Sequence, residues 1–214
     1  MKSILLSIKP EWLCKILNGE KTIEVRKKFP KDYAGWVYLY CSKGNDALWC
    51  LNQGAKNQTF KLYKDITAKD NDLFVEEWTC NNKLNGKVVA RFWCDKVEEI
   101  ELWYSPARAD NCVDYDEWYY ETQTLDEDDL LYGSCLSQEN LTNYLCRKDN
   151  SKGFAIHISK LEIFDRPKEL SEFYTTKLDE DLTKRFDNSI QLENGTWVKR
   201  ITKEPQNYCY IEGE

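Results

Sequence analysis

Three short segments of the chain, residues 36–42, 86–94 and 153–158, are apolar at both odd and even positions. Successive side chains of a strand point to opposite faces of a sheet, so a run of this kind fits a strand that is buried on both faces. Such strands are typical of a small closed or half-closed barrel, whose sheet packs on itself and on flanking helices. The pattern therefore predicts an architecture with strands in its interior.

The first 26 residues predict a strand, a helix and a second strand. Residues 4–8 are apolar and predict the first strand. Pro10 suits the first position of a helix, because that position needs no N–H donor, and Gly19 suits a left-handed cap at the helix end. Residues 22–26 alternate between apolar and polar side chains, which predicts a strand with two distinct faces.

The remaining sequence predicts one elaborated domain over residues 1–214. Segment 43–85 is polar, and segment 105–135 is acidic and rich in Tyr and Trp. We interpret both as insertions at barrel loops, and we find no internal repeat or flexible Gly/Ser linker that would divide the chain. Two further helices are expected, one over residues 136–146 with Ser137 as its N-cap and a short one that begins at residues 167–170.

Charge is distributed unevenly along the chain. The net charge is −7, which disfavours indiscriminate binding to a phosphate backbone. Residues 1–43 carry nine Lys or Arg and four Asp or Glu, whereas residues 95–130 carry two and thirteen. The basic N-terminal part is compatible with a small pocket for one or a few nucleotides. The alternative is that both regions are ordinary solvated faces.

The cysteine and histidine content argues against a metal centre. The nine cysteines include no Cys-x-x-Cys pair, and the single histidine is His157. We expect reduced thiols, no metal and no cofactor. His157 lies on a strand that is predicted to be buried, and we interpret it as a core or edge histidine. With no signal peptide and no apolar run of membrane-spanning length, we expect a cytoplasmic chain without a membrane partner.

The densest group of chemically useful side chains lies in residues 19–26, at the junction of the first helix and the second strand. Glu24 and Arg26 share one face of that strand. With Lys21 they form one acid between two cations, which can bind an anion or recognise a base edge and can perturb one another's pKa values. The alternative is a surface ion-pair cluster, worth about 0–1 kcal/mol.

The string G-x-K-x-x-E-x-R resembles the signature of the ASCH domain family, whose fold is related to the PUA domain. Gly19, Lys21, Glu24 and Arg26 occupy its four positions. Residues 205–210 look like the closing segment of a phage- and bacteria-associated branch of the family. The resemblance also extends to residues 7–10, 38–42, 86–89, 153–156 and 167–170.

This resemblance implies an α+β fold, a PUA-like β-barrel of five or six strands with flanking helices, and a cleft beside the motif. It also implies binding of RNA or a nucleotide in the control of translation or transcription. One small branch with a similar motif hydrolyses the acetyl amide of N4-acetylcytidine with a lysine, a threonine and a glutamate. Lys21 matches that lysine, but Glu24 occupies the threonine position. Ribonuclease activity is also associated with the family.

The predicted cleft takes side chains from the motif and from neighbouring strand ends. Lys21 and Arg26 are predicted to place a phosphate, and Glu24 to accept a hydrogen bond from a base or to hold Arg26. Tyr40 is a candidate stacking platform for a base, whereas Tyr38 is predicted to be core. The full predicted set of ligand contacts is Ser7, Lys9, Gly19, Lys21, Glu24, Arg26, Tyr40 and Ser42. The two serines could equally bond to backbone, and Lys9 could be solvated.

Three functions follow from these observations. The first is an RNA- or nucleotide-binding regulatory module. The alternative is a hydrolase, either an amidohydrolase acting on an N4-acylated cytidine or a ribonuclease, with Lys21 as general base and Glu24 as its partner. A further alternative is an adaptor that binds a protein partner through the acidic aromatic segment 105–135.

Overall fold

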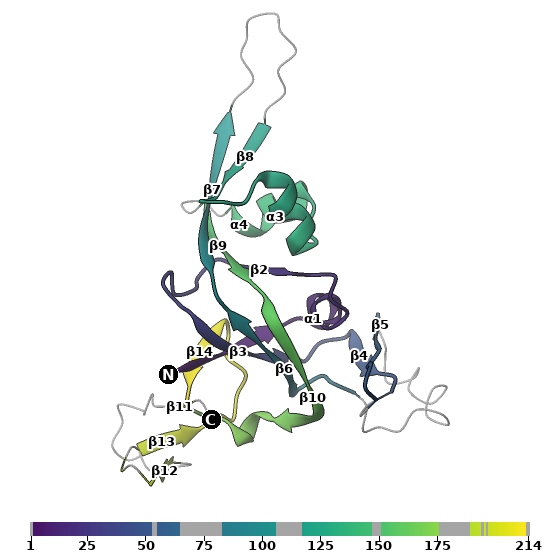
Figure 1. Cartoon of the computed structure of the whole chain (residues 1–214), viewed down its shortest axis with the longest axis vertical. Coiled ribbons are helices and arrows are strands. Elements are labelled where there is room, and N and C mark those ends of the chain that lie inside the picture. Colours follow the sequence, from purple (N-terminus) through teal and green to yellow (C-terminus); the bar gives the residue numbers. More distant parts are fainter. Residues whose placement is uncertain are drawn as a thin grey trace, which may run out of the picture. The chain divides into compact units, whose positions relative to one another are not determined.

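The structure is a computed structural model that describes residues 2–52, 55–64, 83–105, 117–146, 151–175, 189–193, 195 and 197–212. The described part is a mixed α+β fold that consists mostly of strands, with three α-helices (Figure 1). The chain groups into two compact units. Unit 1 comprises Met1–Asn18, Gly35–Trp93 and Lys160–Glu214, and unit 2 comprises Gly19–Ala34 and Cys94–Ser159.

Unit 1 is built on a five-stranded sheet with the order β10-β6-β3-β1-β14. β1 is parallel to β3, with Ser7 opposite Tyr40, and antiparallel to β14. The predicted strands at 4–8, 36–42 and 86–94 are thereby confirmed. The strand bounds are β1 Ser3–Ile8, β3 Gly35–Cys41, β6 Lys87–Cys94, β10 Ser159–Glu169 and β14 Tyr208–Ile211.

Helix α1, Pro10–Leu17, begins and ends where the sequence predicts. Pro10 occupies the first turn, and Leu13 and Ile16 lie on the buried face of the helix. The helix ends before Gly19, whose φ of 75° is the left-handed conformation that glycine adopts without steric cost. The turn after α1 therefore delivers the chain directly to the motif.

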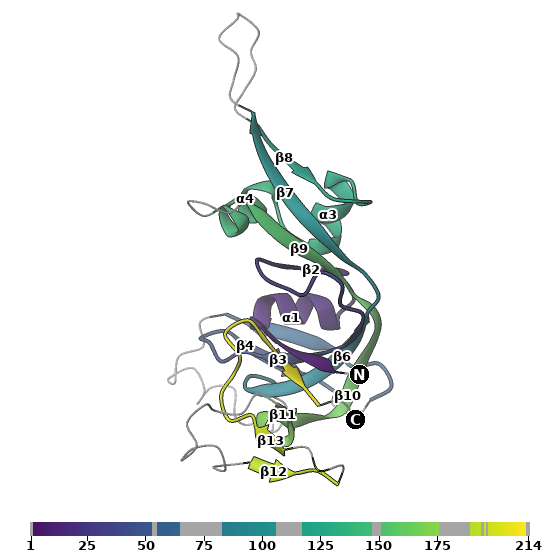
Figure 2. The same cartoon turned by 90° about the vertical axis from the view of Figure 1, so that its left-hand side faces the viewer.

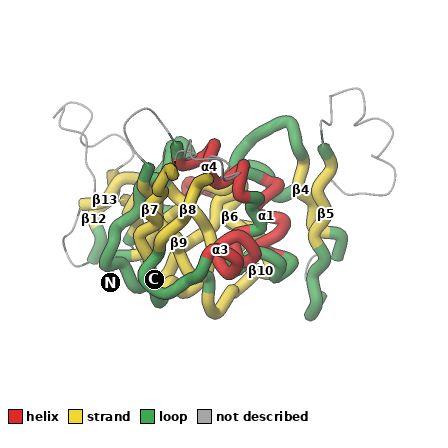
Figure 3. The backbone as a smooth tube through the Cα atoms, turned by 90° about the horizontal axis from the view of Figure 1, so that it is seen from above, coloured by secondary structure: helices red, strands yellow, loops and turns green. Residues whose placement is uncertain are grey.

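The remaining strands of unit 1 form two small sheets. β4 (Ala47–Cys50) and β5 (Phe60–Tyr63) form a hairpin, visible side by side in Figure 3. This hairpin lies within the predicted insertion 43–85, of which residues 53–54 and 65–82 lie outside the described part. A three-stranded sheet has the order β11-β13-β12, with bounds β11 Tyr174–Thr175, β12 Ser189–Gln191 and β13 Trp197–Arg200.

The predicted helix at residues 167–170 is wrong. Pro167 lies in strand β10, and only a 3₁₀ turn, η2 (Leu170–Glu172), follows it. β10 is an edge strand of the five-stranded sheet. An edge strand tolerates proline because it has a row of N–H groups that no neighbouring strand needs.

A buried cluster on the five-stranded sheet forms one core of unit 1. Tyr38 belongs to it, as predicted, and Tyr40 is buried with it. The other buried members are Leu5, Val88, Leu170, Phe173, Ile201 and Ile211.

Unit 2 is a four-stranded antiparallel sheet with two helices packed on one face (Figure 2). The strand order is β2-β9-β7-β8, with bounds β2 Ile23–Arg26, β7 Val97–Ser105, β8 Glu117–Glu121 and β9 Lys152–His157. The helices are α3 (Glu127–Ser134) and α4 (Gln138–Leu145). Ser137 accepts a hydrogen bond from the Asn140 backbone N–H at 3.2 Å, which confirms the predicted N-cap.

The core of unit 2 lies between this sheet and its helices. Ile23 and Val25 contribute to it from β2, on the face that the alternating pattern predicts. The other buried members are Ile100, Leu102, Leu130, Leu141, Leu145 and Ala155. Glu24 and Arg26 therefore belong to the opposite face of the strand.

The described strands do not close into the predicted barrel of five or six strands. Their hydrogen-bonded pairs form four open sheets of five, four, three and two strands. The predicted insertion 105–135 contains β8 and α3, and residues 106–116, which include Tyr115, lie outside the described part. No helix in the described ranges is long and apolar enough to cross a bilayer.

Candidate functional site

Lys21 is buried at the start of the candidate site, with a side chain that is 2% exposed. Its Nζ donates a hydrogen bond to the backbone oxygen of Ser134 at 2.6 Å and lies 3.5 Å from Glu24 Oε2. Ser134 ends α3, so the ammonium sits at the negative end of that helix dipole. Burial lowers the pKa of Lys21, and the Glu24 carboxylate opposes this shift.

Glu24 links the two cations of the motif. Its Oε1 lies 2.9 Å from Arg26 Nε, while its other oxygen faces Lys21. The Arg26 side chain is 13% exposed, so it is the member of the trio that is nearest to solvent. The trio therefore converges as a buried chain of alternating charges, and the alternative of a surface ion-pair cluster is wrong.

The local backbone fixes this arrangement. The Thr22 N–H donates to the Gly133 oxygen at 2.8 Å, which ties the entrance of β2 to the end of α3. Glu24 pairs with Ile156 and Arg26 with Phe154 across the β2–β9 ladder. The positions of the three side chains are thus set by a strand register and a helix end together.

Tyr144 of α4 completes the cluster, and sequence reasoning missed it. Tyr144 lies close enough to Arg26 for the guanidinium to act on the pKa of its hydroxyl, and Lys27 Nζ lies 5.0 Å from the centre of the Tyr144 ring. Burial raises the pKa of the Tyr144 hydroxyl, and Arg26 acts against that shift. The residue is nevertheless 38% exposed, which leaves part of its side chain accessible to solvent. The available signal was a tyrosine within the predicted helix 136–146, since a tyrosine buries its ring but needs a partner for its hydroxyl.

A pocket of about 770 Å³ lies beside the end of α3. Cys135 lines it and donates its thiol hydrogen to the Glu20 backbone oxygen at 3.3 Å. Glu20 and Asp128 also line this pocket, whereas the side chains of the Lys21, Glu24 and Arg26 trio do not. The acidic lining is unfavourable for a phosphate, so the Arg26 and Tyr144 side of the cluster is the better candidate for an anionic ligand.

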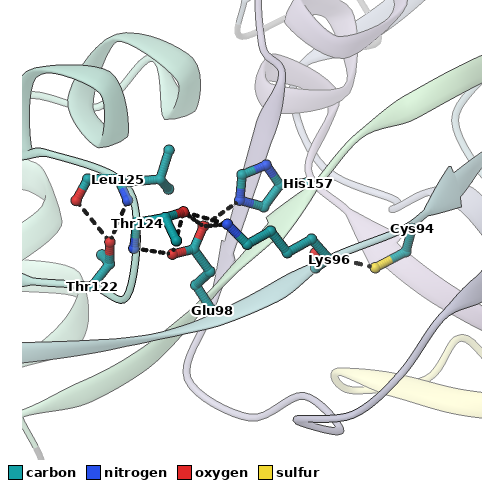
Figure 4. A network of polar contacts seen from close by, with 7 residues as sticks. All are labelled: Cys94, Lys96, Glu98, Thr122, Thr124, Leu125 and His157. Carbon is teal, nitrogen blue, oxygen red and sulfur yellow. Dashed lines mark hydrogen bonds and ion pairs between the residues drawn. The ribbon is translucent and has the colours of Figure 1, made fainter.

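A second polar network in unit 2 is centred on Glu98 of β7 (Figure 4). The fully buried carboxylate accepts hydrogen bonds from the Thr124 N–H at 2.7 Å and from His157 Nε2 at 2.8 Å. Lys96 Nζ lies 2.9 Å from the same carboxylate. Burial alone would raise the pKa of Glu98, but the hydrogen bonds from Lys96, His157 and Thr124 hold this pKa at about 2.

This network connects the sheet to the loop that precedes α3. Thr124 comes from that loop, Glu98 from β7 and His157 from β9. His157 is thus a hydrogen-bonded side chain at the end of β9, which is an interior strand of the sheet between β2 and β7. The network positions the N-terminal end of α3, and Lys21 contacts its C-terminal end.

The other predicted ligand residues lie in unit 1. Ser7 and Tyr40 are opposite each other on β1 and β3. The Ser42 N–H donates to the Ile8 oxygen at 2.8 Å, and the Lys9 oxygen accepts from the Leu13 N–H at 3.0 Å at the start of α1. The structure thus brings Gly19, Lys21, Glu24 and Arg26 together in unit 2 and places Ser7, Lys9, Tyr40 and Ser42 in unit 1.

The described residues contain no group of three or more His, Cys, Asp or Glu side chains that could hold a metal ion. Seven cysteines fall in the described ranges, and all seven are free thiols.

The chain was compared with known proteins. Neither a protein-family model nor a curated protein matches it. Its structure matches the crystal structure of ASCH from Zymomonas mobilis with a TM-score of 0.47 and 12% identity, over 99% of this chain and 88% of that chain. Two mutant forms of that protein match with TM-scores of 0.46 and 13% identity, over 99% of this chain and 91% and 89% of theirs. The chain therefore matches ASCH domain structures over nearly its whole length at low sequence identity.

Proposed function

We propose that the chain is an RNA- or nucleotide-binding regulatory module and that Arg26 contacts a phosphate of the ligand. The observation that carries this proposal is the buried Lys21–Glu24–Arg26 chain, which ends beside the half-exposed Tyr144. Two cations on one carboxylate leave a net positive charge, which favours an anionic ligand next to Arg26.

Each member of the cluster has a distinct role in this proposal. Glu24 holds the Arg26 guanidinium, and Lys21 pairs with the other Glu24 oxygen in a buried position. Lys27, above the Tyr144 ring, offers a second phosphate contact. The Tyr144 ring offers a stacking surface for a base, because a ring face tolerates any base. Gly19 and the unit 1 residues Ser7, Lys9, Tyr40 and Ser42 remain sequence-based predictions of ligand contact.

We also propose that units 1 and 2 act as a single domain. Neither unit is a continuous stretch of chain: Gly19–Ala34 interrupts unit 1, and Gly35–Trp93 interrupts unit 2. Independent domains usually meet at a flexible linker that few contacts cross. Here the sequence of each unit is instead split by a segment of the other unit.

Fluorescence anisotropy with labelled single-stranded oligoribonucleotides tests the binding proposal. Removal of one base-stacking contact is worth about 1–3 kcal/mol, so Tyr144→Leu is expected to weaken binding by about tenfold. Tyr132→Leu is the matched control, because Tyr132 lies on α3 of the same unit and is 86% exposed. Lys27→Gln is expected to weaken binding and to reduce the salt dependence by one phosphate contact.

Arg26→Gln should weaken binding more than Lys27→Gln does. A circular dichroism spectrum of the Arg26→Gln variant shows whether its fold is retained. Binding that is absent from the wild type, or that is equally strong in all four variants, contradicts the proposal.

Hydrolysis of an N4-acylated cytidine or of RNA is a second candidate function. The lowered pKa of Lys21 favours it, because a lysine that loses its proton more readily can serve as a general base. Turnover of N4-acetylcytidine or RNA that is lost in Lys21→Met and Glu24→Gln would support this candidate. Wild-type protein without turnover on either substrate would remove it.

A further inference from the structure

A second pocket, of about 730 Å³, lies within unit 1 and shares no residue with the Arg26 cluster. It is formed by the end of β3, the turn at Gly86, the junction of β10 and η2, and the segment before β14. Its volume falls in the range of small-molecule sites. One of its lining residues is Tyr40, which the sequence analysis predicts as a ligand contact. The lining residues are Tyr40, Lys43, Gly86, Glu169, Leu170, Ser171, Ile201, Thr202, Lys203 and Glu204.

The apolar part of the pocket lining belongs to a packed core. Leu170 and Ile201 are buried members of the same core cluster as Tyr40. Burial, and then the neighbouring Glu204 carboxylate, raise the pKa of Tyr40 to about 12, so its hydroxyl keeps its proton. An apolar base with a few fixed polar groups is the usual construction of a small-molecule site.

The charged groups that line the pocket differ in whether they have a partner within the chain. Glu204 lies near the Tyr40 hydroxyl, and the Glu169 carboxylate is engaged by the Lys87 ammonium and by the backbone of η2. By contrast, Lys43 and Lys203 have no ion-pair or hydrogen-bond partner among the residues that the structure describes. Lys87 offsets the charge of Glu169, so the pocket presents Lys43 and Lys203 to an anion, with Glu204 as the remaining acid that has no ion pair in the described part of the chain.

One lining position of the pocket requires a glycine. Gly86 has a φ of 81°, and a Cβ at this position would lie 3.2 Å from Lys43 Cε and 4.0 Å from the Tyr40 hydroxyl. The turn is fixed by the preceding Asn85, whose side-chain amide donates to the Ser42 and Asp46 oxygens at 3.3 and 2.9 Å. The absence of a side chain at Gly86 thus leaves room for Lys43 in the lining of the pocket.

We propose that this pocket binds a mononucleotide, with the phosphate on Lys43 and Lys203 and the base against Leu170 and Ile201. The hydroxyls of Ser171 and Thr202 line the same space and suit the polar edge of a ribose. The site is independent of the proposed RNA contact at Arg26, because none of its residues belongs to that cluster.

Isothermal titration calorimetry of the full chain with AMP, CMP, GMP and UMP tests this proposal. Ribose 5-phosphate and inorganic phosphate serve as probes of the base contact and of the phosphate contact alone. We expect Lys43→Gln and Lys203→Gln each to raise the Kd of the best mononucleotide by about tenfold or more, since a hydrogen bond to a charged group is worth this order. The double variant should reduce binding further.

Lys56→Gln is the matched control, because Lys56 is an exposed lysine of unit 1 outside the pocket, and its change removes the same charge. All the substituted lysines are exposed, so these variants are expected to fold. Binding of labelled oligoribonucleotides should be unchanged in the double variant, because neither lysine belongs to the Arg26 cluster, and this result separates the pocket from the proposed RNA site.

Three results would overturn the proposal: no heat with any mononucleotide, a Kd that is the same in the double variant and in the wild type, or inorganic phosphate bound as tightly as the best mononucleotide. Backbone amide shifts at Gly86, Ser171 and Thr202 in a nuclear magnetic resonance titration, absent from the double variant, would support it.

Discussion

The Glu98 network provides a direct test of the electrostatics of unit 2. Glu98→Gln keeps the shape of the side chain and an oxygen that can accept from Thr124, but it removes the charge that Lys96 and His157 face. The pKa of Glu98 is about 2 in the folded chain, against 4.5 for a free glutamate. Each pH unit of this difference corresponds to about 1.4 kcal/mol, so the charge contributes on the order of 3 kcal/mol at neutral pH.

The sign of the pH dependence follows from the direction of this shift. Because the folded pKa is lowered, the contribution is complete above pH 4.5 and is lost as the pH falls towards about 2. Wild type should therefore exceed Glu98→Gln in unfolding free energy by about 3 kcal/mol at pH 7 and by roughly 1 kcal/mol at pH 3. Urea denaturation followed by tryptophan fluorescence at a series of pH values measures this difference.

Glu101→Gln is the matched control for this experiment. Glu101 lies on the same strand and pairs with Lys152, but its side chain is partly exposed. An exposed pair contributes about 0–1 kcal/mol, so this variant should stay close to wild type. A difference between wild type and Glu98→Gln that does not shrink between pH 7 and pH 3 would refute the reasoning.

Three further changes test the packing around the site. Lys21→Met leaves the Glu24 carboxylate buried beside Arg26 alone. We expect the free energy of unfolding, measured by urea denaturation, to fall by about 3–5 kcal/mol. A variant as stable as the wild type would contradict a buried pair. Gly153→Ala would put a Cβ 2.6 Å from Leu145 Cδ2. We expect this contact to cost about 1–3 kcal/mol of stability and to lower the melting temperature. An unchanged or raised melting temperature would show that the core accommodates the added methyl group. Ser137→Ala removes the N-cap of α4 and should cost about 0.5–2 kcal/mol, whereas Ser137→Asp should restore it; equal stability of the two variants would argue against the cap.

The parts of the fold that the sequence predicts are those that depend on neighbouring residues. Pro10 and Gly19 delimit α1, and Ser137 starts α4, because caps and breakers act within a few residues. The alternation of residues 22–26 likewise places Ile23 and Val25 in the core of unit 2.

The parts that the sequence does not predict depend on distant partners. The burial of Lys21 requires the backbone oxygen of Ser134, which is 113 residues away and carries no signal in a side-chain pattern. Pro167 suits both a helix start and an edge strand, and only the position of β10 in the sheet decides between them. The four open sheets differ from the expected barrel because strand pairing is also a long-range property.

The link between Lys21 and Ser134 has a consequence for how the chain is made. Strand β2 leaves the ribosome long before β9, its ladder partner, and before the end of α3, which accepts the Lys21 hydrogen bond. During that interval the nascent chain carries an unpaired strand and a solvated lysine, and closure of the intervening loop must precede their pairing. The Arg26 cluster is therefore assembled late in synthesis, and a truncated product that stops before β9 contains the whole motif without a formed site.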